Sequence, residues 1–229
     1  MSKLTIGEMI EQVPEGQAQT FERSIADPGE ERYLKVSQNW DYHPERKEWL
    51  NYPSSEDAPW FGTRLKPRIS LSRLARPNVR FKGPSEQVVD LYSSSSHAFF
   101  ISDKLFRMIE GMDPGSLEHI GFELRAKDGV LPFRAVMPRR HLEAIDTRRT
   151  TVRIEDKALG GQYFRKVLFP EGIVFDNDVL QGVSSFSDLD ARGWFWSKDL
   201  IAEAKSQGIR GISAASPASA AMRRVVESF

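Results

Sequence analysis

The stretch FFISDKLFRMIEG, residues 99–111, joins a short apolar run to a helical pattern through a single serine. Ser102 ends the run, and apolar side chains then recur at helical spacing from Leu105 to Ile109. Serine is a preferred N-cap because its oxygen accepts a hydrogen bond from a free N–H group of the first helical turn. Gly121 and Phe122 follow in a segment with strand character. We therefore predict a strand, a Ser-capped helix and a second strand.

A second stretch, WFWSKDLIAEAKSQGIRGI at residues 194–212, repeats this order about 95 residues later. Ser197 takes the place of the capping serine, and Leu200 is the first apolar residue of the helical pattern. Gly208 is placed to end the helix. Gly211 and Ile212 then correspond to the Gly-aromatic pair of the first stretch. We predict a second unit that is related to the first.

The rest of the chain fits a sheet around these two units. Segments with strand character occur at 133–137, 151–154, 162–169 and 172–175. The predicted fold class is α+β, a mostly antiparallel sheet with a few packed helices. Turn-forming residues near 83–96 indicate an irregular or β-rich segment over 1–84 and an α+β domain over 85–229, or one continuous domain. Ser216 and Pro217 predict a last helix that runs to residue 229.

Composition limits the possible functions. The chain has 229 residues, with 32 basic and 32 acidic side chains, so its net charge is zero and a general nucleic-acid binder is disfavoured. The absence of cysteine excludes disulfides and thiolate sites. No apolar run is long enough to span a membrane, and the start has no signal-peptide pattern. We expect a cytoplasmic protein that binds neither nucleic acid nor membrane.

Few residues are arranged for catalysis. The four histidines form no metal-binding motif, and the chain has no nucleophile elbow and no phosphate-binding loop. We predict no cofactor, no metal and no catalytic residue. An alternative is an enzyme in which Asp176 and Asp178 act together with His97 or His119. That alternative requires these side chains to meet in one cleft.

Charge is segregated along the chain. Residues 64–82 hold seven basic side chains and no acid, whereas residues 171–190 hold five acids and no base. An acidic surface can attract a basic protein partner and accelerate its association. Trp194 and Trp196 share one face of a strand, where they pack in the core or form an exposed interface hot spot. The predicted partner-binding residues are Glu171, Asp176, Asp178, Asp188, Asp190, Trp194 and Trp196.

Both units and the segment between them resemble the bacterial polymorphic-toxin immunity family eleven, first noted in a Myxococcus protein and formerly described as a domain of unknown function. Members show a strand, a Ser-x-x-Leu helix start and a Gly before an aromatic strand. The segment AVMPRRHLEAIDTRRTTV, residues 135–152, places Asp146 at the family's Asp position. The family's His-x-Phe element is replaced here by Ser-Ser-Phe at 184–186, and the first 80 residues show no counterpart.

This resemblance implies a protein without enzymatic activity that binds a cognate toxin encoded beside it, in systems that are often contact-dependent secretion systems. The toxin-binding prediction then applies to the acidic and tryptophan residues named above. An adaptor or chaperone that binds an effector without neutralising it is the second possibility, and the carboxylate enzyme is the third. The oligomeric state stays open. The resemblance gives structural roles to Ser102, Leu105, Gly121, Asp146, Ser197, Leu200 and Gly211.

Overall fold

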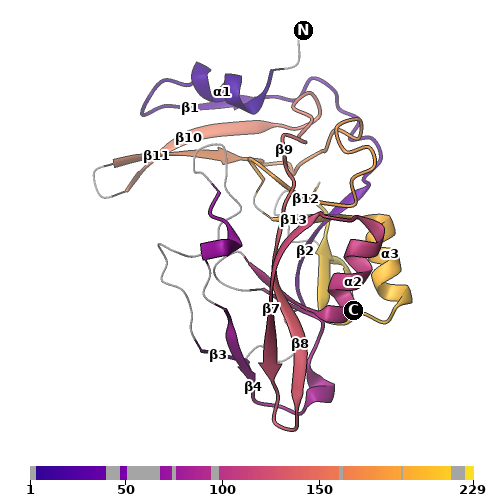
Figure 1. Ribbon diagram of the computed structural model, residues 1–229. Helices are drawn as coiled ribbons and strands as arrows, with labels where there is room; N and C mark the ends of the chain where they lie inside the picture. Colours follow the sequence, from indigo (N-terminus) through magenta and orange to yellow (C-terminus); the bar gives the residue numbers. More distant parts are fainter. Residues whose placement is uncertain are drawn as a thin grey trace.

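The computed structural model describes residues 4–39, 47–50, 68–73, 76–93, 98–159, 162–191, 193–217 and 225–229. Figure 1 shows two large sheets, with helices α2 and α3 together on one flank and a smaller sheet with α1 at one end. The α+β prediction is confirmed: mostly antiparallel sheets dominate the fold. No helix among the described residues has the length and hydrophobicity of a membrane span.

The first large sheet has the strand order β3-β4-β7-β8-β6-β5. Its neighbours pair antiparallel, except that β4 and β7 are parallel. The long β7–β8 hairpin projects at the end of the molecule opposite α1 (Figure 1). The elements of this part are β3 (Lys47–Leu50), η2 (Leu71–Arg73), β4 (Asn78–Phe81), η3 (Ser85–Gln87), β5 (Leu91–Ser93), β6 (Phe99–Ser102), α2 (Asp103–Met112), β7 (Leu117–Arg125) and β8 (Val130–Pro138).

The second large sheet has the order β15-β14-β2-β13-β12-β9. Only β12 and β9 pair parallel in it. The predicted helix after residue 217 is wrong where it can be checked, because 225–228 pair with β14 as an edge strand. The elements are β2 (Tyr33–Gln38), β9 (His141–Leu142), β12 (Ser185–Asp188), β13 (Trp194–Ser197), α3 (Lys198–Ser206), β14 (Ile212–Ala215) and β15 (Val225–Ser228).

The small sheet joins the N-terminal segment to the middle of the chain. Its strands are β1 (Ala18–Phe21), β10 (Val152–Leu159) and β11 (Gln162–Leu168), in the order β1-β10-β11. Helix α1 (Ile6–Gln12) begins at Thr5, whose side chain and that of Glu8 form a reciprocal capping box. Buried Met9 and Val13 pack with Val152 and Ile154 in a separate small core.

The two predicted Ser-capped units have the same local geometry. Ser102 and Ser197 are both N-caps with φ −62°, and ψ is 154° at the first and 152° at the second. Each hydroxyl accepts a hydrogen bond from the N–H of the leucine three residues later, Leu105 or Leu200, at 3.1 Å. The two helices contact each other. The Ser-capped prediction is therefore confirmed for both units.

The units also share a topology that their sequences do not reveal. In the first unit, α2 connects β6 to β7, and β8 lies between these strands, antiparallel to both. In the second, α3 connects β13 to β14, and β2 lies between them in the same way. Each unit is thus a split strand–helix–strand crossover. The inserted strand comes from the adjacent hairpin in one unit and from the N-terminal segment in the other.

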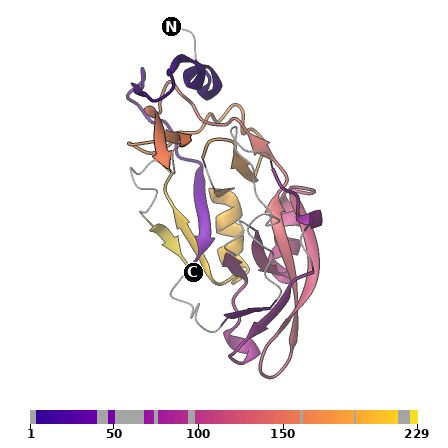
Figure 2. The same ribbon diagram turned by 90° about the vertical axis from the view of Figure 1, so that its left-hand side faces the viewer.

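Reciprocal hydrogen bonds tie the two units together. Asp113, which follows α2, accepts from the N–H groups of Ser184 and Ser185 at 3.0 and 3.1 Å, where β12 begins. Asp90, which precedes β5, accepts from the N–H of Arg210 after α3 at 2.9 Å. The end of each helix is thus hydrogen-bonded to the start of a strand in the other large sheet, α2 to β12 and α3 to β5. Figure 2 shows the two sheets on either side, with α3 between them in projection.

The main core is continuous across both large sheets. It includes Leu34 and Val36 of β2, Phe99 of β6 and Trp194 of β13. Strands from residues 33–38 and 78–81 therefore lie inside sheets built mostly from later residues. The predicted division of the chain into two domains at residue 84 therefore stays a prediction.

Candidate functional site

The acidic segment, residues 171–190, is held against the body by aromatic side chains. The Phe175 ring lies 4.9 Å from that of Phe195 and 5.2 Å from that of Phe186, measured between centroids. Phe175 also forms a bridge with Ile145, and the Asp176 N–H donates to the Ala144 carbonyl at 2.7 Å. These contacts place Asp178 and Glu171 on the surface.

Bases from elsewhere in the chain reach this segment. Glu171 pairs with Arg23 at 3.3 Å, between half-exposed side chains. Arg148 hydrogen-bonds to Asp146, which raises the pKa of Arg148, and the charges of Asp176 and Asp178 raise it further. The acids therefore form a surface that is partly neutralised, and its field is weaker than the sequence alone indicates.

Asp188 faces the interior. It is 2% exposed, and its carboxylate accepts hydrogen bonds from the N–H groups of Ala144, Asp190 and Ala191 at 2.8 to 2.9 Å. Burial raises the pKa of Asp188 to about 6, although these hydrogen bonds act in the opposite direction. Its role in this structure is to hold the chain between β9 and β13, and it has no surface for a partner.

A hollow of about 230 Å³ adjoins Asp188. Asp190 and Glu143 line it together with Thr5 and Thr147. Within the described ranges, no three carboxylate or histidine side chains are grouped so as to hold a metal ion.

Trp194 and Trp196 occupy the core. Both are 0% exposed, and their ring centroids lie 4.9 Å apart. Trp194 Nε1 donates to the Ser185 hydroxyl at 2.7 Å. The structure thus supports core packing, the first of the two possibilities left open for this pair, and neither indole offers surface to a partner. Of the predicted partner-binding residues, Glu171, Asp176, Asp178 and Asp190 keep some exposure, and their role stays a prediction.

Two hollows lie on the surface beside Tyr33, the first residue of β2, next to the acidic segment. One measures about 400 Å³ and the other about 220 Å³, and Glu30, Arg32, Tyr33 and Asn177 line both. The Tyr33 hydroxyl lies 2.9 Å from the Leu180 carbonyl and 2.7 Å from that of Val183, which fixes the wall between them. Arg32 pairs with Glu30 at 2.7 Å. We call this surface the Tyr33 groove; its lining includes both a basic and an acidic side chain.

Two histidines, His119 and His141, have defined neighbours in the described part of the chain. The His119 ring packs on Phe106 at 4.6 Å and lies 3.2 Å from Arg134, so burial and then the Arg134 charge lower its pKa. His141 lies 2.9 Å from the buried Ser187 hydroxyl, and burial lowers its pKa to about 4. His119 thus contacts Phe106 and Arg134, and His97 lies outside the described part of the chain.

The remaining motif residues have visible packing roles. Asp146 is fully buried and pairs with Arg148 and Arg149, each at 3.2 Å. Gly211 has φ +89°, and a Cβ there would meet Val89 Cγ2 at 2.6 Å, so the position requires glycine. Gly121 lies in β7 opposite Arg134.

Sequence reasoning missed the bases that meet the acidic segment and the Tyr33 groove. The signal for Arg148 was present in the pair Arg148-Arg149, two residues after the family-pattern Asp146. Arg23 and Arg32 carried no such signal, because their approach depends on where the N-terminal segment crosses the sheets.

Comparison with known proteins identifies the family. The chain matches the model of an immunity protein family, Imm11, over residues 20–216. No curated protein matches it. The matched range contains both Ser-capped units, the strand inserted in each and the acidic segment. The chain belongs to the Imm11 immunity protein family.

Proposed function

We propose that this protein neutralises a cognate bacterial toxin by direct protein–protein contact and without chemistry of its own. Membership of the immunity family across residues 20–216 carries the proposal. The toxin is encoded nearby as part of a polymorphic toxin system, and the complex forms in the cytoplasm.

The Tyr33 groove and the exposed acids beside it are the proposed contact surface. The groove offers a wall fixed by the Tyr33 hydroxyl, with Arg32, Glu30 and Asn177 on its rim. Asp178 is exposed at its edge on the same loop. A fixed wall with polar groups around it loses little conformational entropy on binding.

Co-expression is the direct test. Each gene encoded beside this one is expressed alone and then with this protein, and growth is measured. Rescue from a toxic neighbour, together with a stoichiometric purified complex, supports the proposal. A complex in which the neighbour stays toxic indicates an adaptor or chaperone instead. If no neighbour is both toxic and bound, the proposal fails.

A charge-reversal pair then tests the surface. The double variant Glu171→Lys/Asp178→Lys is expected to weaken toxin binding about fivefold at low salt, since exposed ion pairs contribute about 0.2–1 kcal/mol each. The matched control, Glu11→Lys/Glu15→Lys, changes the net charge equally on exposed residues of the N-terminal segment. Equal affinities of the two variants would exclude this surface but leave the immunity function standing.

A further inference from the structure

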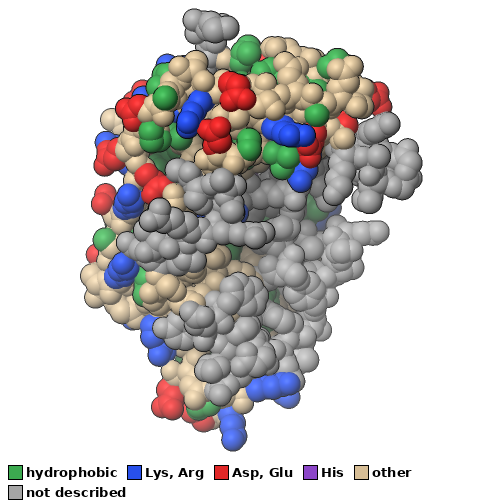
Figure 3. All heavy atoms as spheres, turned by 180° about the vertical axis from the view of Figure 1, so that it is seen from behind, with side chains coloured by type: hydrophobic (Ala, Val, Ile, Leu, Met, Phe, Trp, Pro, Cys, Tyr) green, Lys and Arg blue, Asp and Glu red, His purple; other side chains and the backbone are tan. Residues whose placement is uncertain are grey.

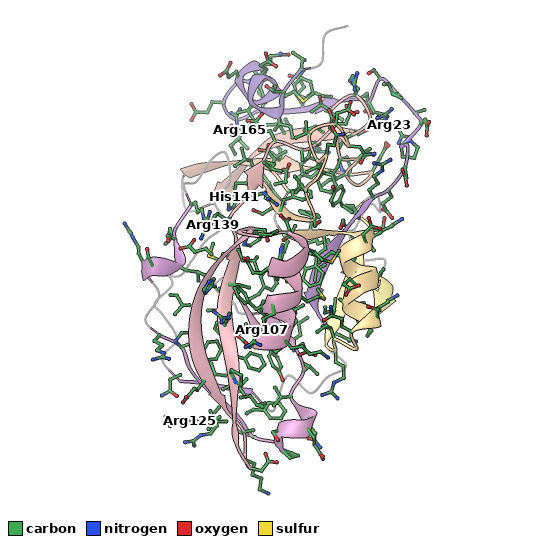
Figure 4. All side chains as sticks on the ribbon, turned by 45° about the vertical axis from the view of Figure 1, so that its right-hand side comes forward. Arg23, Arg107, Arg125, Arg139, His141 and Arg165 are labelled. Carbon is green, nitrogen blue, oxygen red and sulfur yellow. The ribbon has the colours of Figure 1, made fainter. Side chains whose placement is uncertain are left out.

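A basic surface lies at the end of the molecule remote from the acidic segment. Exposed Arg76, Arg80, Arg125 and Lys127 come from the segment around β4 and from the far end of β7. Within the described residues no ion pair joins any of them to a carboxylate. Figure 3 shows Lys and Arg side chains at this end of the molecule, and Figure 4 places Arg125 there, below Arg107 of α2. We call these four residues the basic end.

The strand register brings two of these charges together. Arg80 of β4 is the direct partner of Arg125 of β7 in a parallel pair, so both side chains leave the same face. Like charges on directly paired positions are destabilising. Glu48 of β3 is the partner of Arg80 on its other side. Arg80 therefore has a base beside it on β7 and an acid beside it on β3.

One arginine is oriented before any ligand arrives. Arg76 donates from Nε to the Gly121 carbonyl at 3.2 Å, which fixes the plane of its guanidinium. A hollow of about 280 Å³ lies beside it, lined by Arg76, Pro77, Asn78, Glu123 and Arg125. Because Nε is occupied, the terminal nitrogens remain for an oxygen pair, the fork geometry that matches a carboxylate. Glu123 on the same wall limits how much negative charge the hollow accepts.

We propose that the basic end docks an acidic surface of a protein partner, with a carboxylate side chain of that partner held between Arg76 and Arg125. The inference rests on the proposed function only for the identity of the partner as the toxin. A protein is favoured over a nucleic acid because Glu123 and Asp128 interrupt the charge and would repel a continuous row of phosphates.

The test uses the full-length protein and two defined probes, poly-L-glutamate and a DNA duplex, titrated at low and at physiological salt. The variant Arg76→Glu/Arg125→Glu is expected to bind poly-L-glutamate about tenfold more weakly. The control Arg139→Glu/Lys166→Glu makes the same net-charge change on exposed residues away from this end and is expected to change affinity less than about twofold. Circular dichroism confirms that each variant is folded.

A third variant separates oriented binding from mere charge. Arg76→Lys keeps the charge but removes the fork and the bond to Gly121, and a loss of about threefold for poly-L-glutamate is expected. Equal binding by all variants, tighter binding of the duplex than of poly-L-glutamate, or no binding of either probe overturns the proposal. Growth rescue by co-expression is scored separately, so failure of the immunity function is distinguishable from failure of this surface.

Discussion

The two Ser-capped units are nearly identical locally and differ in how their sheets are completed. Both caps have the same backbone angles and the same 3.1 Å hydrogen bond. Strand β8 fills the first unit from the adjoining hairpin, whereas β2 fills the second from more than 150 residues upstream. Two units with the same strand–cap–helix sequence pattern can therefore differ in the order of their strands along the chain. A split crossover needs only an antiparallel strand of suitable apolar pattern between its two parallel strands.

The largest expected difference in stability between the units concerns the strand that precedes each helix. Trp194→Ala is expected to lower the free energy of unfolding by about 5 kcal/mol and Phe99→Ala, at the corresponding position, by about 3 kcal/mol. Both changes remove a buried ring, but only Trp194 also donates to the buried Ser185 hydroxyl. Urea denaturation measures both. Equal losses would show that the hydrogen bond of Trp194 contributes nothing to the asymmetry.

The reciprocal bonds between the units are also unequal. Asp113 is 4% exposed, binds Arg140 at 2.5 Å and accepts from two N–H groups of β12, so Asp113→Ala is expected to cost about 3 kcal/mol. Asp90 is half-buried and accepts from the Arg210 N–H and the Ser102 hydroxyl, so Asp90→Ala is expected to cost about 2 kcal/mol. The same denaturation series compares them. A larger loss at Asp90 would contradict the view that the junction after α2 is the stronger one.

The caps sharpen the comparison further. Ser197→Ala is expected to cost about 1 kcal/mol, the usual contribution of a serine N-cap. Ser102→Ala is expected to cost about 2 kcal/mol, because the Ser102 hydroxyl also donates to Asp90 at 2.5 Å. Serine-to-glycine variants at both positions serve as controls, since glycine is tolerated at an N-cap. Indistinguishable losses at the two caps would mean that the bond to Asp90 is replaced by solvent.

The smallest expected effect concerns pH at the outer edge of the second sheet. Burial lowers the pKa of His141 to about 4, so between pH 6.5 and 4 the unfolded chain takes up a proton that the folded protein does not. Stability is therefore lost as pH falls through this window. His141→Gln is expected to remove about 1 kcal/mol of that loss, a value reduced for the partial exposure of the ring.

This pH effect is measured as the difference between the stability curves of the variant and the parent protein at pH 7 and pH 4.5. The raised pKa of Asp188 acts in the opposite direction, since the folded protein binds its proton more readily than the unfolded chain does below pH 6. Asp188 is unchanged in both proteins, so its contribution cancels in the difference. If the stability of the variant and of the parent protein changes equally between pH 7 and pH 4.5, His141 is charged at pH 4.5 in the folded protein as well.

Sequence reasoning succeeded where the cause was local. Ser102 and Ser197 were identifiable as caps because a cap depends on one side chain and the next helical turn. It could not show that β2 completes the second unit, since this pairing joins residues far apart in the chain. The acidic segment shows the same limit: its five acids lie within residues 171–190, but Arg23 and Arg148 approach them only through the fold. Likewise, the sequence Trp-Phe-Trp in a strand does not distinguish core packing from an exposed interface.

The insertion of β2 has a consequence for biosynthesis. Leu34 and Val36 of this strand are buried in the folded protein, and the strands that pair with β2, within residues 194–215, are made roughly 160 residues later in synthesis. At about 5–20 residues per second, the strand leaves the ribosome some 10–30 seconds before its neighbours. The first unit, whose strands are all close in sequence, can form during this interval. An apolar strand that waits this long for its partners is a natural binding site for the chaperones that attend nascent chains.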